Sequence, residues 1–350
     1  MKIVHVINSL ATGGAENLVV NLAAQANSTG HQSRILVFKD SHGIPRTRAL
    51  ELGIDVKVLG KSIRDPRLLY RLRSATEDAD IVHVHLFPAL YWSLFVKVPK
   101  IFTEHSTHNR RVGKIAFRIT EYFAYEQFEK IVAISEGVAE SVKLHLEKIK
   151  SNTAVEVVPN GIPGDFFEIE RKYRLEPTRI ISIGSLKSIK RHHLALEAVA
   201  LLENVSLRIA GDGPLKGELQ ESIDDLEIGE RVELLGNVED IPGLLADSDL
   251  LLSTSLYEGF GLAAAEAQAA GIPVVGPNVS GFREVVINGE TGILFEKDDP
   301  QSIAHAVAKA LDEENYQRLV RNARRMTQKY TIENCFGHLL QIYKAVLSAK

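Results

Sequence analysis

Residues 250–275 constrain the fold more than any other stretch of this sequence. A short apolar run at 250–252 predicts a buried strand, and a second run at 272–275 predicts another. Between them, a glycine loop leads into a helix of strong helix formers over 262–270, which Gly271 ends. Strand, loop, helix and strand in this order form the unit from which parallel sheets are built. The stretch therefore predicts an α/β protein.

The loop and helix of this stretch also contain candidate binding residues. Gly259 and Gly261 let the backbone approach a ligand closely, and the N–H groups that open the helix attract phosphate. Glu266 lies inside the helix among small alanines, where a carboxylate needs hydroxyl or N–H partners. A ribose diol would supply such partners. The alternative is a surface helix with one solvated glutamate, and the helix alone does not distinguish the two.

Length and composition limit the class of protein. The chain has 350 residues, of which 45% are hydrophobic and 25% charged, so it is long enough for two globular domains. A net charge of −4 gives no indication of nucleic-acid binding. Cys335 is the only cysteine, which excludes an internal disulfide and fits a reducing, cytoplasmic compartment. We expect no signal peptide, and no apolar run approaches the ~20 residues that span a bilayer.

The alternation of strands and helices predicts two domains. Strand-like runs separated mostly by helical stretches predict a parallel sheet covered on both faces. Pro, Asn-Gly and Pro-Gly within 157–164 predict the boundary, after which the alternation restarts. We therefore predict two doubly wound, Rossmann-like domains over residues 1–160 and 165–330. The predicted strands lie at 2–7, 34–38, 55–59, 81–85, 100–103 and 130–134, then at 180–184, 206–210, 231–235, 250–252, 272–275 and 293–295.

The loop over 103–111 contains the densest polar chemistry in the sequence. It leaves the carboxyl end of a predicted strand, which is the edge where open α/β sheets bind ligands. His105, His108, Asn109 and Arg110 are therefore candidate binding residues. A polar surface loop without a ligand is the alternative.

His83 and His85 lie on one face of a predicted strand, an arrangement that would suit a metal ion. No third ligand lies at a motif spacing. We therefore interpret both histidines as structural, with His85 near the carboxyl end of the strand as a candidate cleft residue.

The segment after the polar loop predicts a basic amphipathic helix. Arg110, Lys114 and Arg118 recur at helical spacing, while apolar side chains between Ile115 and Phe123 occupy a different face. Such a helix suits peripheral contact with an anionic membrane. An ordinary surface helix packed on a sheet has the same pattern, so both interpretations stay open.

A basic loop follows the first predicted strand of the second half. It contains Lys187, Lys190 and Arg191 and differs from a P-loop. Together with the helix that opens near Phe260, these cations predict a diphosphate site that needs no metal. The two Asp-x-Asp pairs, at 78–80 and 247–249, precede strands and so lie at the edge opposite to the ligand. We therefore predict no catalytic metal.

With these features placed, the chain resembles the family 4 retaining glycosyltransferases, whose glycosyltransferase-B fold has two facing Rossmann-like domains. The resemblance covers nearly the whole length and is most specific in the spacing of Glu258 and Glu266, an E-x7-E motif. Shorter motifs occur in the order found in the family. They are G-G-A-E at 13–16, T-E-H at 103–105, A-I-S-E at 133–136, V-P-N-G at 158–161 and G-D-G-P at 211–214.

The resemblance implies a nucleotide-sugar donor site in the second domain. Glu266 would hold the donor ribose, Glu258 would contact the transferred sugar, and Lys190 would bind the diphosphate. Where many members have Gly-Arg-Leu, this chain has Ser185 in place of the arginine, and we expect Lys187 or Arg191 to supply the missing cation. The donor-binding residues implied are Gly14, Lys187, Lys190, Arg191, Gly211, Phe260, Gly261, Leu262 and Glu266.

The resemblance also implies an acceptor site mainly in the first domain, onto which the C-terminal helix over 331–350 would cross back. His105 would lie beside the reacting carbon, so the implied catalytic residues are His105, Glu258 and Lys190. The implied acceptor-binding residues are Gly13, His108, Asn109 and Arg110.

The function implied is transfer of a hexose, expected from a UDP-sugar, to a saccharide or lipid-linked acceptor with retention of anomeric configuration. Residues 103–111 resemble members that build bacterial surface polysaccharides on lipid carriers. We therefore expect a cytoplasmic enzyme of cell-envelope polysaccharide synthesis that needs no cofactor, since the nucleotide-sugar is a co-substrate. Two alternatives are a nucleotide-sugar 2-epimerase, for which no acid–base motif is evident, and a non-catalytic sugar-nucleotide sensor, against which the intact candidate residues argue.

Overall fold

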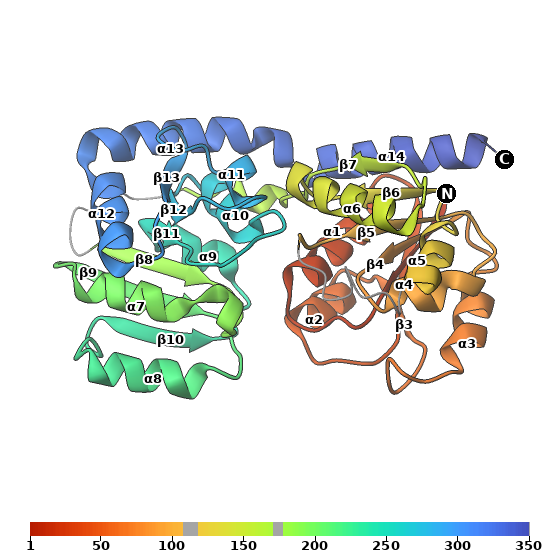
Figure 1. Cartoon of the computed structure of the whole chain (residues 1–350), viewed down its shortest axis with the longest axis horizontal. Helices are drawn as coiled ribbons and strands as arrows, with labels where there is room; N and C mark the ends of the chain where they lie inside the picture. Colours follow the sequence, from red (N-terminus) through yellow and green to blue (C-terminus); the bar gives the residue numbers. More distant parts are fainter. Residues whose placement is uncertain (108–117, 171–177, 350) are drawn as a thin grey trace. The chain divides into compact units, whose positions relative to one another are not determined.

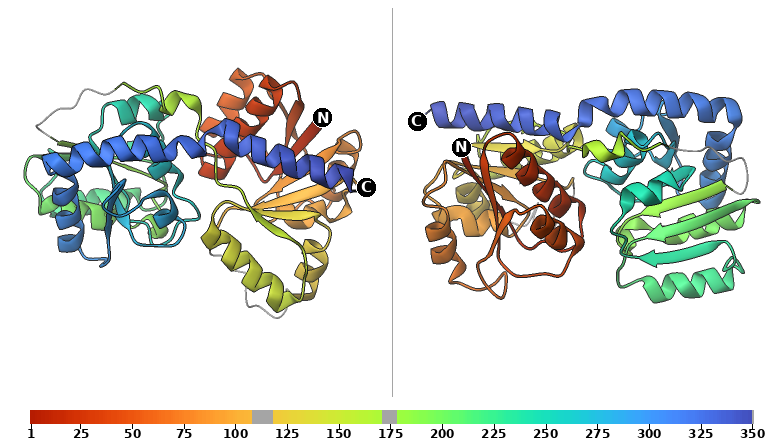
Figure 2. Two further views of the ribbon diagram at one scale, coloured as in Figure 1. Left: turned by 90° about the horizontal axis from the view of Figure 1, so that it is seen from above. Right: turned by 180° about the vertical axis from the view of Figure 1, so that it is seen from behind.

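The computed structural model describes residues 1–107, 118–170 and 178–349. The chain divides into two compact units, one formed by Met1–Gly161 with Ile332–Lys350 and the other by Ile162–Thr331. Each unit contains a parallel sheet flanked by helices, as Figures 1 and 2 show. The predicted fold class, α/β with two Rossmann-like domains, is confirmed.

The first unit is built on a seven-stranded parallel sheet. Its strand order is β3-β2-β1-β4-β5-β6-β7, so the direction of winding reverses between β1 and β4. The strands are β1 (Lys2–Ile7), β2 (Gln32–Val37), β3 (Asp55–Val58), β4 (Ile81–His85), β5 (Lys100–Glu104), β6 (Lys130–Ala133) and β7 (Val155–Val157). The helices are α1 (Gly14–Ser28), α2 (Ile44–Glu51), α3 (Leu68–Ala75), α4 (Ala89–Trp92), α5 (Arg118–Tyr125), α6 (Glu136–Ile149) and α14 (Ile332–Ser348).

Helices α1 and α14 cover one face of this first sheet. Alternate residues of neighbouring strands point to the same face, and Ile3, Ile81 and Ile101 pack there in one buried cluster. Phe336 and Leu339 of α14 belong to the same cluster. The last helix of the chain therefore completes the core of the first unit.

The second unit is built on a six-stranded parallel sheet of order β10-β9-β8-β11-β12-β13. The strands are β8 (Thr178–Ile183), β9 (Val205–Ala210), β10 (Val232–Gly236), β11 (Leu250–Leu252), β12 (Val274–Pro277) and β13 (Gly292–Phe295). The helices are α7 (His192–Ala200), α8 (Lys216–Asp225), α9 (Ile241–Ala246), α10 (Leu262–Ala269), α11 (Phe282–Val285), α12 (Pro300–Leu311) and α13 (Glu313–Thr327).

Side-chain caps explain where several of these helices begin. Ser135, Asp299 and Asp312 precede α6, α12 and α13, and each side chain accepts a hydrogen bond from the backbone N–H three residues later. Such a cap satisfies a backbone donor that the first turn of a helix leaves unpaired. The structure adds short elements that the sequence did not predict, including β7, α2 and α9. Each is shorter than the stretch of sequence over which hydrophobic periodicity becomes evident.

The chain passes between the units twice, at Gly161 and again at Thr331. The first crossing lies inside the turn-rich segment 157–164. A Cβ on Gly161 would lie 2.7 Å from the Cα of Ile332, so this position requires glycine. Within the described part of the chain, none of the helices is both long and apolar enough to cross a bilayer.

Candidate functional site

The second sheet has its switch point between β8 and β11. Strands β9 and β10 extend the sheet on one side of β8, while β11, β12 and β13 extend it on the other. Loops 184–191 and 253–261 therefore leave the carboxyl edge next to one another. Ligands of open α/β sheets bind at such points.

Lys190 and Glu258 meet at this switch point. The Lys190 ammonium lies 2.5 Å from a carboxylate oxygen of Glu258, and the Ser255 hydroxyl donates to the same oxygen at 2.7 Å. The Lys190 side chain is 24% exposed and that of Glu258 is 17% exposed, so both are reachable but partly shielded from water. The cation can bind a phosphate, and the carboxylate can accept hydrogen bonds from sugar hydroxyls.

Two glycines let the neighbouring loops approach this pair closely. A Cβ on Gly211, where φ is +152°, would lie 2.0 Å from the carbonyl oxygen of Gly184. A Cβ on Gly281, where φ is +78°, would lie 2.5 Å from the carbonyl oxygen of Glu258. Both positions combine a backbone conformation that favours glycine with no space for a side chain. Gly211, a predicted donor-binding residue, thus supports the loop that presents Lys190.

Helix α10 begins directly after Gly261, where φ is +87°. The Phe260 ring is buried and packs edge-on against Tyr330, with ring centroids 5.2 Å apart, so only the Phe260 backbone is available to a ligand. Glu266 is half-buried one turn into the helix, after the half-buried Leu262 that opens it. The helix N-terminus adds backbone N–H groups to the same edge as Lys190.

Gln268 lies on a different side of α10 from Glu266. The Gln268 side chain is fully buried, and its amide donates to the hydroxyl of Thr291 at 2.9 Å. Two positions along a helix correspond to a rotation of about 200°, which agrees with the different burial of the two side chains. Glu266 remains a predicted ribose contact.

Arg191 joins the β8 loop to the β11 loop. Its guanidinium donates to the carbonyl oxygens of Thr254 and Ser255 at 2.9 and 3.3 Å, and to both carboxylate oxygens of Asp298 at 2.7 and 3.0 Å. This interaction is not apparent from the sequence, because Asp298 lies far along the chain and no motif indicates it. Lys187 differs, since its side chain is exposed and its ammonium has no partner among the described residues.

In the first unit, the glycine pair predicted after β1 lies at the start of α1. Gly13 precedes α1 in an extended conformation, with φ of −179°, and the exposed Gly14 is the first residue of the helix. Three predicted acceptor-binding residues lie outside the described residues. These are His108, Asn109 and Arg110.

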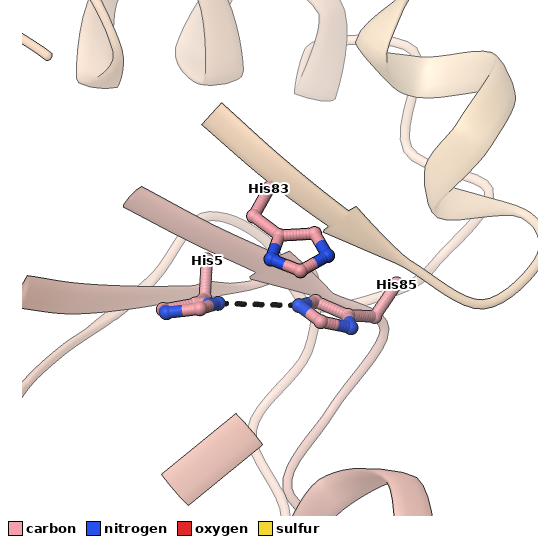
Figure 3. Close-up of side chains that lie close together, drawn as sticks. All are labelled: His5, His83 and His85. Carbon is pink, nitrogen blue, oxygen red and sulfur yellow. Dashed lines mark hydrogen bonds between the residues drawn. The ribbon is translucent and has the colours of Figure 1, made fainter. Parts of the chain in front are cut away.

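Histidines from adjacent strands gather behind the carboxyl edge of the first sheet. His5 on β1 lies near His83 and His85 on β4, with one nitrogen of each ring within 4.8 Å of the others (Figure 3). His5 is not apparent as a third histidine from the sequence, because β1 is distant in sequence and pairs with β4 only in the folded sheet. The signal that could have found it is the register in which His5 lies opposite His83.

Hydrogen bonds already engage these rings. His83 bonds through Nδ1 to the hydroxyl of Tyr343 at 2.7 Å and through Nε2 to the hydroxyl of Thr103 at 2.6 Å. Nδ1 of His5 bonds to Nε2 of His85 at 3.1 Å. A metal ion at this cluster would have to replace bonds that the side chains make with one another. The structure therefore favours the structural interpretation of His83.

His105, the predicted catalytic histidine, is half-buried directly after β5. Its Nε2 bonds to Nδ1 of His85 at 3.2 Å. Burial lowers the pKa of His5 and of His105 to about 4 and holds the pKa values of His83 and His85 well below the usual range. All four rings are therefore neutral near pH 7.

The two Asp-x-Asp pairs directly precede β4 and β11, at the amino edges of the sheets. Asp78 forms ion pairs with Lys2 and Arg34, and Asp249 accepts hydrogen bonds from the backbone and side chain of Arg179. The structure thus places both pairs away from the carboxyl edges, as predicted. Both pairs therefore form structural ion pairs next to the first residues of β4 and β11.

The described part of the predicted basic helix is α5. It exposes Ile119, Tyr122 and Phe123, whose exposed fractions are 73%, 36% and 59%. Arg118 donates to the carbonyl oxygen of Lys148. The preceding basic residues lie outside the described residues, and membrane contact stays a prediction.

Comparison with solved structures identifies the fold. The Anabaena protein Alr3699/HepE in complex with UDP and glucose matches with a TM-score of 0.85 and 20% identity, over 99% of this chain and 100% of that chain. A glycosyltransferase from Rickettsia africae ESF-5 matches with a TM-score of 0.83 and 21% identity, over 100% and 99%. The two units therefore define a glycosyltransferase-B fold.

Sequence comparison identifies the family within that class. The family model described as Glycosyltransferase Family 4 matches residues 12–166, and the model described as Glycosyl transferases group 1 matches residues 165–326. The N-acetyl-alpha-D-glucosaminyl L-malate synthase of Bacillus anthracis is 28% identical over 292 residues, which are 77% of this chain and 76% of that protein. This chain belongs to the family 4 glycosyltransferases.

Proposed function

We propose that this protein transfers a hexose from a UDP-sugar to a saccharide or lipid-linked acceptor with retention of anomeric configuration, in cell-envelope polysaccharide synthesis. The observation that supports this most is the Lys190–Glu258 pair at the switch point of the second sheet, beside the N-terminus of α10. The UDP and glucose bound to Alr3699/HepE, which has the same fold, agree with a UDP-sugar donor.

The chemistry assigned to these residues follows from the charge that develops during transfer. Breaking the anomeric C–O bond builds positive charge on the sugar and negative charge on the leaving diphosphate. Lys190 and the N–H groups that open α10 would stabilise the diphosphate from fixed positions. Glu258 would orient the sugar through its hydroxyls, and Glu266 would hold the ribose. The acceptor would bind the first unit, near Gly13 and the loop that follows β5.

A donor screen followed by a transfer assay tests this function. Thermal unfolding should shift upward with one class of UDP-, GDP- or ADP-sugar, because a ligand that binds only the folded state stabilises it by mass action. The same donor should then label a saccharide or lipid extract, with the donor's anomeric configuration retained in the product. Donor binding without transfer to any extract would support a sensor, and conversion of the donor sugar without an acceptor would support an epimerase.

We expect activity to be independent of divalent metal. The Asp-x-Asp pairs lie at the amino edges in ion pairs with arginine, while Lys190 lies at the carboxyl edge where the diphosphate is proposed to bind. Transfer rates measured in EDTA should therefore equal those measured in manganese or magnesium. Loss of activity in EDTA that manganese restores would contradict the proposal.

Lys187 is proposed to supply the cation that Ser185 lacks. Arg191 already donates to Asp298 and to loop carbonyls, whereas the ammonium of Lys187 has no described partner. An exposed charge is screened by water, so Lys187→Ala should lower kcat about fivefold. Lys309→Ala is the matched control, because Lys309 is an exposed lysine on α12. It should leave kcat unchanged. Equal rates for Lys187→Ala and the unaltered protein would show that Lys187 does not compensate.

A further inference from the structure

Three imidazoles form a hydrogen-bonded chain across adjacent strands of the first sheet. Nδ1 of His5 bonds to Nε2 of His85 at 3.1 Å, and Nδ1 of His85 bonds to Nε2 of His105 at 3.2 Å. His5 and His85 are fully buried, whereas His105 is half-buried at the carboxyl end of β5. This row of hydrogen-bonded rings therefore runs from the core of the first unit to the carboxyl edge of its sheet, where the acceptor is proposed to bind.

The sheet itself fixes these rings relative to one another. His5 lies opposite His83 in the register of β1 and β4, and His85 lies opposite Thr103 in the register of β4 and β5. Residues two apart on a strand point to the same face, so all of these side chains share the face covered by α14. His105 follows Thr103 by two residues and continues the same row.

Neutral imidazoles impose one direction of donation along the whole chain. Each neutral ring has one N–H and one bare nitrogen, so a ring that accepts at one nitrogen must donate from the other. Either His5 donates to His85 and His85 donates to His105, or both bonds point the other way. In the first case the proton of His105 lies on Nδ1, and in the second it lies on Nε2.

The far nitrogen of His5 distinguishes the two directions. Nε2 of His5 is buried and has no hydrogen-bond partner among the described residues. Donation toward His5 would force a proton onto this nitrogen and create a buried N–H without an acceptor. Donation from His5 leaves only a bare lone pair there. Buried N–H groups without a partner are the rarer of the two defects in folded proteins.

We propose that His5 and His85 are positioning residues that hold His105 as a neutral imidazole with its proton on Nδ1. His105 then offers a hydrogen-bond donor, and no base, to a sugar oxygen. The placement of His105 at the substrate rests on the proposed function, whereas its tautomer depends only on the first unit. A metal ion held by His5, His83 and His85 is disfavoured because it would replace the existing bonds to Tyr343, to Thr103 and between the rings.

The test measures the tautomer of His105 by NMR in protein labelled with nitrogen-15 at histidine, without substrate. The signals of His105 are identified by their loss in His105→Gln. We expect the unaltered protein to show the Nδ1–H tautomer at pH 8. A His105 proton found on Nε2 instead would overturn the proposed direction.

Two substitutions of His5 test whether the hydrogen bonds from His5 through His85 set the tautomer of His105. Both Asn and Asp place a side-chain atom near the position of the histidine Nδ1. His5→Asn retains an N–H that can donate to His85, so His105 should keep its proton on Nδ1. His5→Asp can only accept when ionised, so it should reverse both bonds and move the proton of His105 to Nε2. An unchanged His105 tautomer in folded His5→Asp would overturn the relay.

A matched control and a kinetic readout separate positioning from general destabilisation. Tyr343→Phe removes one hydrogen bond from neighbouring His83 and should leave the tautomer and kcat unchanged. His5→Asp should lower kcat about tenfold at unchanged donor KM, as expected for loss of one hydrogen bond. Stoichiometric metal in the purified protein that is lost in His5→Asn would also overturn the proposal. The NMR result stands even where no transferase activity is found, so the two proposals fail separately.

Discussion

Replacing Lys190 with methionine is expected to lower kcat about 10²–10³-fold, the usual loss when one fixed donor to a developing anion is removed. Lys190 lies at the switch point of the second sheet, paired with Glu258 and only 24% exposed. Its stem passes over Gly184, where a Cβ would come within 3.1 Å of the Lys190 Cε, so the ammonium is held in place. Methionine keeps the unbranched stem as far as Cε and removes the ammonium group.

Lys309→Met is the matched control, because Lys309 is an exposed lysine on α12 of the same unit. It should retain full kcat. Circular dichroism should show native structure for both variants, since a partly exposed ion pair contributes little to folding. A Lys190→Met enzyme with normal kcat would remove Lys190 from the catalytic machinery and leave the helix N-terminus as the main partner of the diphosphate.

Substitutions of the two glutamates of the E-x7-E motif should affect different kinetic constants in the same assay. A ribose contact is made equally in the ground and transition states, so Glu266→Ala should mainly raise the donor KM. Glu258→Ala should mainly lower kcat, because Glu258, which pairs with Lys190, is proposed to orient the transferred sugar. The opposite pattern would reverse the assignment of the two carboxylates.

The second large expected effect is loss of stability of the first unit between pH 6.5 and pH 4. Burial lowers the pKa of His5 to about 4 from an ordinary value of 6.5. A group whose pKa is lower in the folded state binds protons more readily when unfolded, so acid favours unfolding. The stabilisation is complete above pH 6.5 and is lost as pH falls toward 4. A shift of this size corresponds to about 3 kcal/mol, and His83 and His85 act in the same direction.

The only tryptophan, Trp92, belongs to α4 of the first unit and makes its fluorescence a specific probe. Urea unfolding followed by this signal should give a free energy that falls steeply below pH 6.5. His5→Asn removes one titrating group, so the slope should decrease by up to about 1.4 kcal/mol per pH unit. His338→Asn, at an exposed position of α14, is the control and should leave the slope unchanged. A pH-independent stability would show that the buried histidines titrate alike in both states.

Patterns within short stretches of sequence predicted the elements whose ends are marked by neighbouring residues. The bounds predicted for β4 and β11 are those of the structure, because an Asp-x-Asp pair marks where each strand begins. The predicted fold class and family are confirmed, since they follow from the order of many such units.

Interactions between distant segments could not be predicted in this way. Lys190 and Glu258 were both candidates, yet their direct pairing depends on β8 and β11 being neighbours in the sheet. Arg191 was expected at a phosphate, but its bonds to Asp298 join segments more than a hundred residues apart. His5 was overlooked for the same reason. The candidate residues at 108–110 lie outside the described residues, so their roles stay predictions.

The position of α14 has a consequence for the order in which the chain folds during synthesis. Seven of its side chains are buried in the first unit, which corresponds to on the order of 10 kcal/mol of hydrophobic stabilisation, comparable with the whole stability of a typical domain. The ribosome makes these residues only after all of the contiguous segment Ile162–Thr331. The second unit can therefore fold first. Until α14 is made, the apolar face formed by β1, β4 and α1 remains exposed to water. A nascent chain that has not yet released α14 is expected to be the form that chaperones bind.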